Sequence, residues 1–274
     1  MTVLYAVLMG VIQGLTEFLP VSSSGHLAIF QIVFGVESPG LFFDVLLHIG
    51  TLVAVFVCFY KDIGKMIAEL FLMIRDLFLR KKVLTNAYRK MDLLLIVATI
   101  PTGIIGVVDS DLVEKAGKIL IFPGICLILT GFILLIADHC PEGKRLPKNT
   151  TFTNAFLIGI AQGVATLPGI SRSGTTITAC LLSGFQKKYA VKFSFLLSIP
   201  AILGSLVFEL KDIELSAING NDALCYVIGM VVAAVVGYIS IRTMLVIVQK
   251  KKFLGFSIYC FAVGAASIIG YCVI

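Results

Sequence analysis

Long apolar runs separated by short polar segments extend along the whole chain and predict membrane-spanning helices. A helix of about 20 apolar residues crosses the hydrocarbon core of a bilayer, and six runs approach or exceed that length. These runs cover residues 41–60, 92–108, 119–137, 190–209, 223–248 and 253–273. The pattern therefore predicts an all-α polytopic membrane protein.

Two further apolar segments, residues 3–34 and 152–184, are interrupted by proline, glycine and serine. These residues break a helix, yet the segments carry too little polarity for a loop in water. We expect each to be a re-entrant pair, in which two helices joined by a break lie within the membrane. Lipid offers no partners for backbone polar groups, so both breaks should face an internal polar pocket.

The two broken segments are copies of one another. The sequence GVIQGLTEFLPVSSSGH at residues 10–26 recurs as GIAQGVATLPGISRSGT at residues 159–175. The copies differ in their reactive residues, because the first carries Glu17 and His26 whereas the second carries Arg172. The first copy therefore supplies a candidate acid or base, and the second supplies a candidate anion-binding residue.

The span count and the basic residues together predict inverted-topology repeats. Three spans separate the copies, so the broken segments should enter the membrane from opposite faces. Four loops hold 17 Lys and Arg residues and two others hold 3, which by the positive-inside rule places the first four in the cytoplasm and both termini outside. The predicted repeats, each a re-entrant pair plus three spans, cover residues 1–137 and 152–274, with a cytoplasmic linker at 138–151.

Within the longest basic loop, residues 63–78 have the spacing of an amphipathic helix lying along the inner surface.

Composition agrees with this class and excludes others. Of the 274 residues, 58% are hydrophobic and 14% are charged, and the mean hydropathy is +1.03. The net charge of +6 comes from residues scattered through short loops, so we expect no nucleic-acid partner. Most of the 7 cysteines lie singly in apolar runs without metal-site spacing, so we expect small buried side chains. No Lys or Arg precedes the first apolar run, so a cleaved signal peptide is not expected.

Arg172 is the basic residue that topology does not explain. Of the 22 Lys and Arg residues, only Arg172 and Arg242 lie outside the loops, and Arg242 is close enough to a helix end to reach the cytoplasmic surface. An arginine in a membrane-embedded break needs an anion, which indicates a functional site in preference to a structural ion pair. A helix resuming at about Thr175 would direct its positive end to the same point. Together with Ser173 and Gly174, these features predict a phosphate cradle.

The first copy supplies candidate acids, bases and nucleophiles. Gln13 and Glu17 lie four residues apart on one helical face before the break, where the carboxylate can hold a divalent cation or act as a base. Three serines follow at residues 22–24, of which at least one should cap the next helix and another can be a nucleophile. His26 can serve as acid, base or phosphoryl acceptor.

The motif QGLTEFLPVSSSGH, followed far downstream by LPGISRSGTT, resembles the undecaprenyl-diphosphate phosphatase family, the bacitracin-resistance membrane proteins, over nearly the whole chain. The resemblance implies hydrolysis of undecaprenyl diphosphate to undecaprenyl phosphate and inorganic phosphate at the outer face of the bacterial plasma membrane. It also implies recycling of a cell-wall lipid carrier, with a divalent cation, Mg or Ca. Family members often carry Glu where this chain has Gln13, so we expect Gln13 to be an orienting residue or a weak metal ligand. By motif position, active-site roles fall to Glu17, Ser22, Ser23, His26, Arg172, Ser173 and Thr176.

These residues suggest a mechanism that leaves the nucleophile open. Arg172 would bind the terminal phosphate, and Glu17 would bind the metal or orient the nucleophile. Ser23 is expected to attack with His26 as its proton partner, although His26 itself or a water molecule fits the sequence almost as well. Asp44 and His48, four apart in the next span, are expected to support the site from behind.

The rival interpretation is a secondary transporter or flippase of a lipid phosphate, because carriers commonly have inverted repeats with broken helices. The division of reactive groups between the copies favours an enzyme, since transport alone does not require it. The partners expected for the enzyme are a polyprenyl diphosphate substrate and membrane lipids, and a homodimer is compatible with the sequence.

Overall fold

The computed structural model describes residues 1–35, 41–117, 119–209, 222–250 and 253–273, and these residues form a helical bundle without a β-strand. In chain order the elements are α1 (Val3–Phe18), α2 (Ser23–Phe34), α3 (Leu41–Phe78), α4 (Ala87–Val108), α5 (Ser110–Gly117), α6 (Ile121–His139), η1 (Pro147–Asn149), α7 (Phe152–Val164), α8 (Arg172–Leu182), α9 (Lys187–Glu209), α10 (Ala223–Ile247), η4 (Val248–Lys250) and α11 (Leu254–Val273). Within these residues, six helices are long and apolar enough to cross a membrane, namely α3, α4, α6, α9, α10 and α11. The predicted all-α polytopic membrane protein is confirmed.

The two predicted breaks are present, but the second helix of the second pair begins earlier than expected. α1 ends at Phe18 and α2 begins at Ser23, while α7 ends at Val164 and α8 begins at Arg172. We expected α8 to begin near Thr175, and this was wrong because Ser171 caps the helix, its hydroxyl accepting a hydrogen bond from the Gly174 N–H at 3.1 Å. Arg172 is therefore the first residue of α8.

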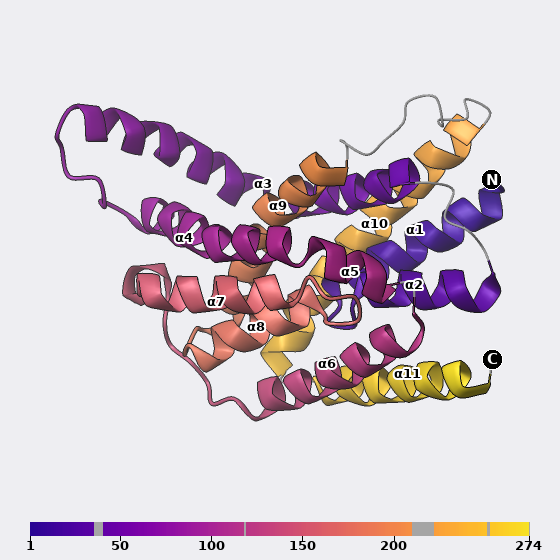
Figure 1. Cartoon of the computed structure of the whole chain (residues 1–274). Helices are drawn as coiled ribbons and strands as arrows, with labels where there is room; N and C mark the ends of the chain where they lie inside the picture. The colour runs from indigo at the N-terminus through magenta and orange to yellow at the C-terminus, as the bar shows by residue number, and fades with distance from the viewer. Residues whose placement is uncertain (36–40, 118, 210–221, 251–252, 274) are drawn as a thin grey trace.

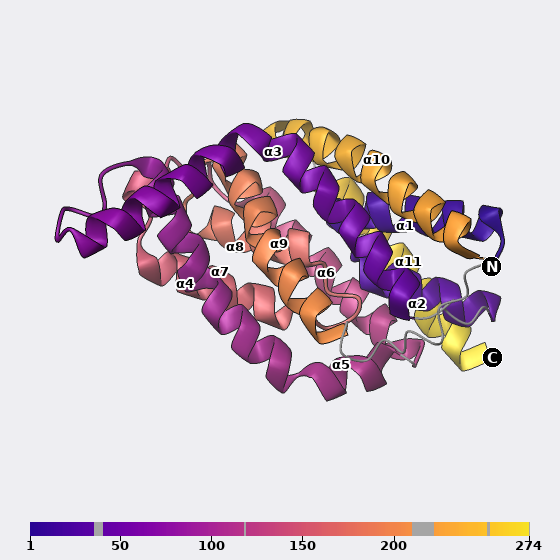
Figure 2. The same cartoon turned by 90° about the horizontal axis from the view of Figure 1, so that it is seen from above.

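The two helix pairs approach the centre of the molecule from opposite ends. Figure 1 shows α1 and α2 extending from their break toward the end that carries both termini, whereas α7 and α8 extend toward the other end, and Figure 2 shows the same arrangement from above. This is the arrangement that an inverted repeat requires. It brings both breaks to the middle of the bundle.

The duplicated glycines allow the first helix of each pair to pack closely on its neighbour. α1 packs extensively on α10, and α7 packs extensively on α4. A Cβ atom at Gly10 of α1 would lie 2.6 Å from the carbonyl oxygen of Gly229, and one at Gly159 of α7 would collide with the Ala98 carbonyl. Gly10 and Gly159 occupy the same position in the two copies, so part of the repeated motif serves helix packing.

α3 continues well beyond its predicted span. We expected a span at 41–60 and a separate surface helix at 63–78, but the structure joins them into one helix that is kinked at Phe59 (φ −113°, ψ 20°). The part after the kink projects toward the end opposite the termini (Figure 2). Arg89 of α4 forms ion pairs with this part of α3, donating to Glu69 at 2.8 Å and to Asp76 at 2.9 Å. These ion pairs hold the part of α3 after the kink against the start of α4.

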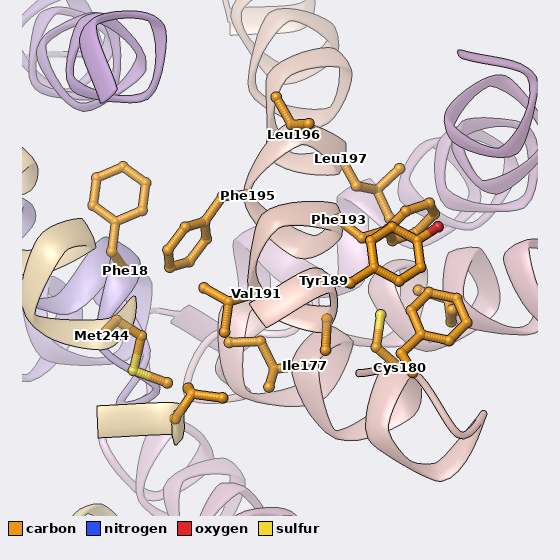
Figure 3. Packing of buried hydrophobic residues seen from close by; sticks show 14 of the residues in the cluster. Phe18, Ile177, Cys180, Tyr189, Val191, Phe193, Phe195, Leu196, Leu197 and Met244 are labelled. Atoms are coloured by element: carbon orange, nitrogen blue, oxygen red, sulfur yellow. The ribbon is translucent and has the colours of Figure 1, made fainter. Parts of the chain in front are cut away.

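The hydrophobic core is centred on α9 and fixes the end of α1. Figure 3 shows Phe193, Phe195 and their neighbours packed between helices of both halves, and both side chains are fully buried. Phe18, the last residue of α1, packs edge-on against Phe195, with ring centroids 5.4 Å apart and planes at 75°. Because Phe18 is locked in the core, the orientation of the preceding residue, Glu17, is also set.

Four of the cysteines expected to be small buried side chains, Cys126, Cys180, Cys225 and Cys260, are buried, and Cys58 is partly buried. All seven are free thiols.

Candidate active site

The two breaks enclose a polar cavity of about 40 Å³. It is lined by Thr16, Glu17, Ser22, Ser23, Ser24, Ala165, Ile170, Ser171 and Arg172. A space of this size accommodates a few water molecules. The prediction that the breaks share an internal polar pocket is confirmed, and Glu17, Ser22, Ser23 and Arg172 all reach it.

Ser22 connects the two breaks by a hydrogen bond. It adopts φ 71°, in the left-handed region that residues other than glycine seldom occupy. Its hydroxyl oxygen accepts hydrogen bonds from the N–H groups of Gly25 at 3.3 Å and Gly169 at 3.2 Å. A Cβ atom at Gly25 would lie 2.7 Å from the Cα of Gly169, so the two backbones are in contact. Ser22 is thus the serine that caps α2, and its lone pairs are already engaged.

The Glu17 carboxylate accepts hydrogen bonds from several polar side chains at the centre of the site. Ser23 Oγ donates to Glu17 Oε2 at 2.6 Å, and Gln13 Nε2 donates to the same oxygen at 3.1 Å. Arg172 Nη2 donates to the other oxygen, Oε1, in an ion pair between the two copies. The Glu17 side chain is 6% exposed and that of Arg172 is 16% exposed, so the pair is largely shielded from water. The anion that meets Arg172 in this structure is Glu17.

The site still has donors for a second anion. Arg172 Nη1 is buried and has no hydrogen-bond partner in the part of the chain that the structure describes. Over the same residues, the N–H groups of Ser23 and Ser24 at the start of α2, and of Arg172 and Ser173 at the start of α8, make no hydrogen bond. The first residues of both helices, Ser23 and Ser24 of α2 and Arg172 of α8, line the cavity, so two helix N-termini and a guanidinium lie at it, an arrangement suited to a phosphate group.

Three predicted phosphate-binding residues lie behind the cavity lining. Ser173 Oγ donates to the Leu19 carbonyl at 3.2 Å, and the Gly174 N–H is bound to the capping Ser171 hydroxyl. Thr176 Oγ1 lies 2.5 Å from Ser194 Oγ and is fully buried. These contacts hold α8 against the first break and against α9. A direct contact of Ser173, Gly174 or Thr176 with phosphate stays a prediction.

Thr130 of α6 is a supporting residue that sequence reasoning missed. Its buried hydroxyl donates to the Gly169 carbonyl at 2.8 Å and accepts from the Ser171 N–H at 3.0 Å. It thereby satisfies two backbone groups of the second break that lipid cannot serve. A single threonine in an apolar helix gives no signal of this role.

His26 is held by a partner that the sequence also did not reveal. Its Nδ1 lies 2.8 Å from the Ser22 carbonyl, and its Nε2 lies 2.8 Å from the Tyr259 hydroxyl on α11. A carbonyl can only accept, so Nδ1 carries the proton, and neutral His26 accepts the Tyr259 hydroxyl at Nε2. His26 does not line the cavity, and Ser23 donates to Glu17. A role for His26 as proton partner of Ser23 stays a prediction.

Asp44 and His48 lie on α3, with His48 Nδ1 donating to the Asp44 carbonyl at 2.9 Å. His48 is near enough to Glu17 for an electrostatic interaction. Its proximity agrees with the expected supporting role, which stays a prediction.

The donor set for a divalent cation is small. No group of three His, Cys, Asp or Glu residues suited to a metal occurs among the described residues. Glu17 is the one carboxylate lining the cavity; Gln13, which bonds Glu17 through Nε2, lies outside that lining, and its Oε1 atom is buried without a hydrogen-bond partner in the described part of the chain. One carboxylate and one amide oxygen fit Mg or Ca when phosphate oxygens and water complete the coordination.

Comparisons with known proteins agree with the two motifs. The family model described as bacitracin resistance protein BacA matches residues 6–266. A protein of Alkaliphilus metalliredigens named undecaprenyl-diphosphatase is 45% identical over 271 residues, covering 98% of each chain. Proteins of the same name from Methanobrevibacter smithii and Halothermothrix orenii are 41% and 39% identical, again over 98% of both chains. The chain is therefore a multi-pass membrane protein that belongs to the family of the bacitracin resistance protein BacA.

Proposed function

We propose that this protein hydrolyses undecaprenyl diphosphate to undecaprenyl phosphate and inorganic phosphate at the outer face of the plasma membrane. The observation that carries the proposal is the convergence of Arg172, Glu17 and Ser23 on one cavity between two helix N-termini. The cavity provides cationic donors for a phosphate, a hydroxyl and a carboxylate. The names of the relatives agree with this chemistry.

Binding of the diphosphate depends on charge neutralisation. The terminal phosphate is received by the buried Arg172 Nη1 and by the unpaired N–H groups at the starts of α2 and α8. The guanidinium then shares its charge between phosphate and Glu17, so the carboxylate becomes a stronger base than in the resting ion pair. Substrate binding itself therefore prepares the proton acceptor.

Ser23 is placed to act as the nucleophile. Its hydroxyl already donates to Glu17 Oε2 at 2.6 Å, so the proton passes to this carboxylate as Oγ attacks phosphorus. The Oγ–P bond forms while the bond from phosphorus to the bridging oxygen breaks, and the lipid monophosphate leaves. Water then cleaves the phosphoserine and releases inorganic phosphate. This assignment replaces His26 by Glu17 as the proton acceptor of Ser23.

Glu17 and the free Oε1 of Gln13 are the residues that would hold a divalent cation beside the phosphate. When bound, the cation would neutralise phosphate charge as a Lewis acid. The isoprenoid tail would remain in the bilayer between helices, so only the headgroup has to enter the cavity.

The proposal that the site faces outside is supported by the distribution of basic residues among the loops. The loops joining α3 to α4, α6 to α7 and α8 to α9 lie at the end opposite both termini (Figure 1), and these loops are rich in Lys and Arg. On a cysteine-free background, a cysteine at Lys115 should react with an impermeant reagent added outside, and one at Lys82 only after permeabilisation. The reverse labelling would place the site on the cytoplasmic face.

The proposal is tested with purified protein, undecaprenyl diphosphate labelled in its terminal phosphate, and Mg or a chelator. We expect phosphate release and, on rapid acid quench, label covalently bound to the parent chain and absent from Ser23→Ala. Ser205→Ala, on an exposed part of α9, is the matched control and should behave as the parent. If phosphate is released without covalent label on the chain, and Ser23→Ala still releases it, the nucleophile is water and not Ser23. Binding without any hydrolysis would favour the lipid-phosphate carrier.

A further inference from the structure

A second cavity lies at the opposite end of the bundle from the termini and shares no lining residue with the first. It has a volume of about 350 Å³ and lies between α3, the start of α4, η1 and the start of α9. Its floor is mainly apolar, with Met66 and Met91, and its polar groups come from Tyr88, Tyr189 and two lysines. None of these residues is used by the proposed hydrolysis.

Tyr189 lines this cavity and carries a buried hydroxyl. Its side chain is 5% exposed, and its hydroxyl has no hydrogen-bond partner within the described chain. The Thr150 side chain, whose hydroxyl donates to the Leu146 carbonyl at 3.0 Å, lies near enough to interact with the Tyr189 hydroxyl. The Tyr189 ring is fixed by stacking on Phe185, with centroids 4.7 Å apart, and Figure 3 shows its hydroxyl at the margin of the hydrophobic cluster. A buried tyrosine hydroxyl usually has a close partner, so the cavity wall includes a rigid hydroxyl whose hydrogen-bonding capacity is not filled by a close contact among the described residues.

The rim of the cavity carries positive charge. Lys192 pairs with Asp62 at 2.6 Å, whereas exposed Lys188 forms no ion pair among the described residues. Lys65 lies over the ring of Tyr88, 5.6 Å from its centroid, and adds a further cation. The combination of an apolar floor, a rigid hydroxyl and cations at the rim suits an amphiphile with an anionic head.

We propose that this cavity binds an anionic phospholipid, with its phosphate at Lys188 and Tyr189 and the first carbons of its chains against Met66 and Met91. The basic loops around the cavity place it at the cytoplasmic leaflet, where anionic lipids are concentrated. Basic pockets between membrane helices are known to receive such head groups. Free phosphate shares the charge but not the hydrocarbon, and the apolar floor favours the lipid.

The test is titration of purified protein in uncharged detergent, followed by native mass spectrometry. Short-chain phosphatidylglycerol should bind at least about tenfold more tightly than phosphatidylcholine of the same chain length. Tyr189→Phe and Lys188→Gln should each weaken phosphatidylglycerol binding about tenfold, as expected for one charge-assisted hydrogen bond. Lys82→Gln, a matched charge removal in the α3–α4 loop outside the cavity lining, should leave binding unchanged.

Equal binding of the two lipids, or binding unchanged by both cavity variants, would overturn the proposal. Inorganic phosphate competing at the same concentration as phosphatidylglycerol would also overturn it, because the site would then select an ion and not a lipid. Tyr189→Phe removes only a hydroxyl that has no close hydrogen-bond partner among the described residues, so it should fold as the parent. The readout is binding, so failure here would leave the proposed hydrolysis untouched.

Discussion

Replacing Arg172 by lysine should lower kcat for undecaprenyl diphosphate about a hundredfold while the protein stays folded. The two terminal nitrogens of Arg172 have different tasks, because Nη2 pairs with Glu17 and Nη1 is buried and available to phosphate. A lysine ammonium occupies one position and can satisfy Glu17 or the phosphate, but not both. Losing one donor to developing transition-state charge costs about 3 kcal/mol, which corresponds to roughly a hundredfold in rate.

Arg172→Ala should lose as much activity and should also be less stable. With Glu17 only 6% exposed, removal of its partner leaves a buried carboxylate without compensation. Breaking such a pair costs about 3–5 kcal/mol. Combining Arg172→Ala with Glu17→Gln removes the unpaired charge, so the double variant should recover much of the melting temperature and none of the activity.

The assay combines thermal melting in detergent with initial rates of phosphate release over a range of substrate concentrations, which separates kcat from KM. Arg242→Lys is the control, because Arg242 lies 5.9 Å from the Tyr238 ring centre on α10, outside the cavity lining. If Arg172→Lys keeps kcat within threefold of the parent, Arg172 serves only as the counter-ion of Glu17. The phosphate would then have to bind elsewhere.

Three further variants probe the surroundings of the site. Thr130→Val should lower stability by about 2–3 kcal/mol and reduce activity, because it leaves a carbonyl and an N–H of the second break unpaired; an unchanged denaturation midpoint would exclude this support. Tyr259→Phe removes the donor to His26 Nε2, so ¹⁵N NMR of labelled histidine should show a changed Nε2 shift while Nδ1–H stays held by the Ser22 carbonyl, and the rate should fall about tenfold. If neither changes, Tyr259 contributes packing alone. Gly159→Leu should prevent α7 from docking on α4 and abolish the cooperative melting transition, whereas Gly204→Leu, where no neighbouring atom lies within 4 Å, should be tolerated. Equal melting of the two glycine variants would show that this close packing is not required.

The amino-acid sequence was sufficient to predict the six membrane-spanning helices, the two breaks and the charged residues at the cavity, but not α5, which lies in a segment expected to be a loop. Apolar run length and helix-breaking residues are local properties, and a membrane makes them decisive because unsatisfied backbone in lipid is so costly. Glu17 and Arg172 stood out for the same reason, as charges in apolar surroundings. The start of α8 was predicted a few residues too late. The expected start followed Gly174, whereas in the structure Ser171 caps the helix and α8 begins at Arg172.

The tertiary structure decided which groups meet. The Glu17–Arg172 pair joins residues 155 positions apart, and His26 meets Tyr259 across 233 positions. Only the packed bundle showed that Ser23 donates to Glu17 and that Ser22 joins the two breaks.

Thr99 and Thr130 illustrate the limit of local pattern. Each is a threonine within an apolar helix, yet Thr99 bonds the Leu95 carbonyl of its own helix at 2.8 Å, whereas Thr130 holds a break 39 residues away. The same hydroxyl can satisfy its own helix or another segment at similar energy, so the sequence around it does not distinguish the two outcomes. The choice depends on which backbone groups the packed helices bring within reach, and that is fixed only when the whole bundle has assembled.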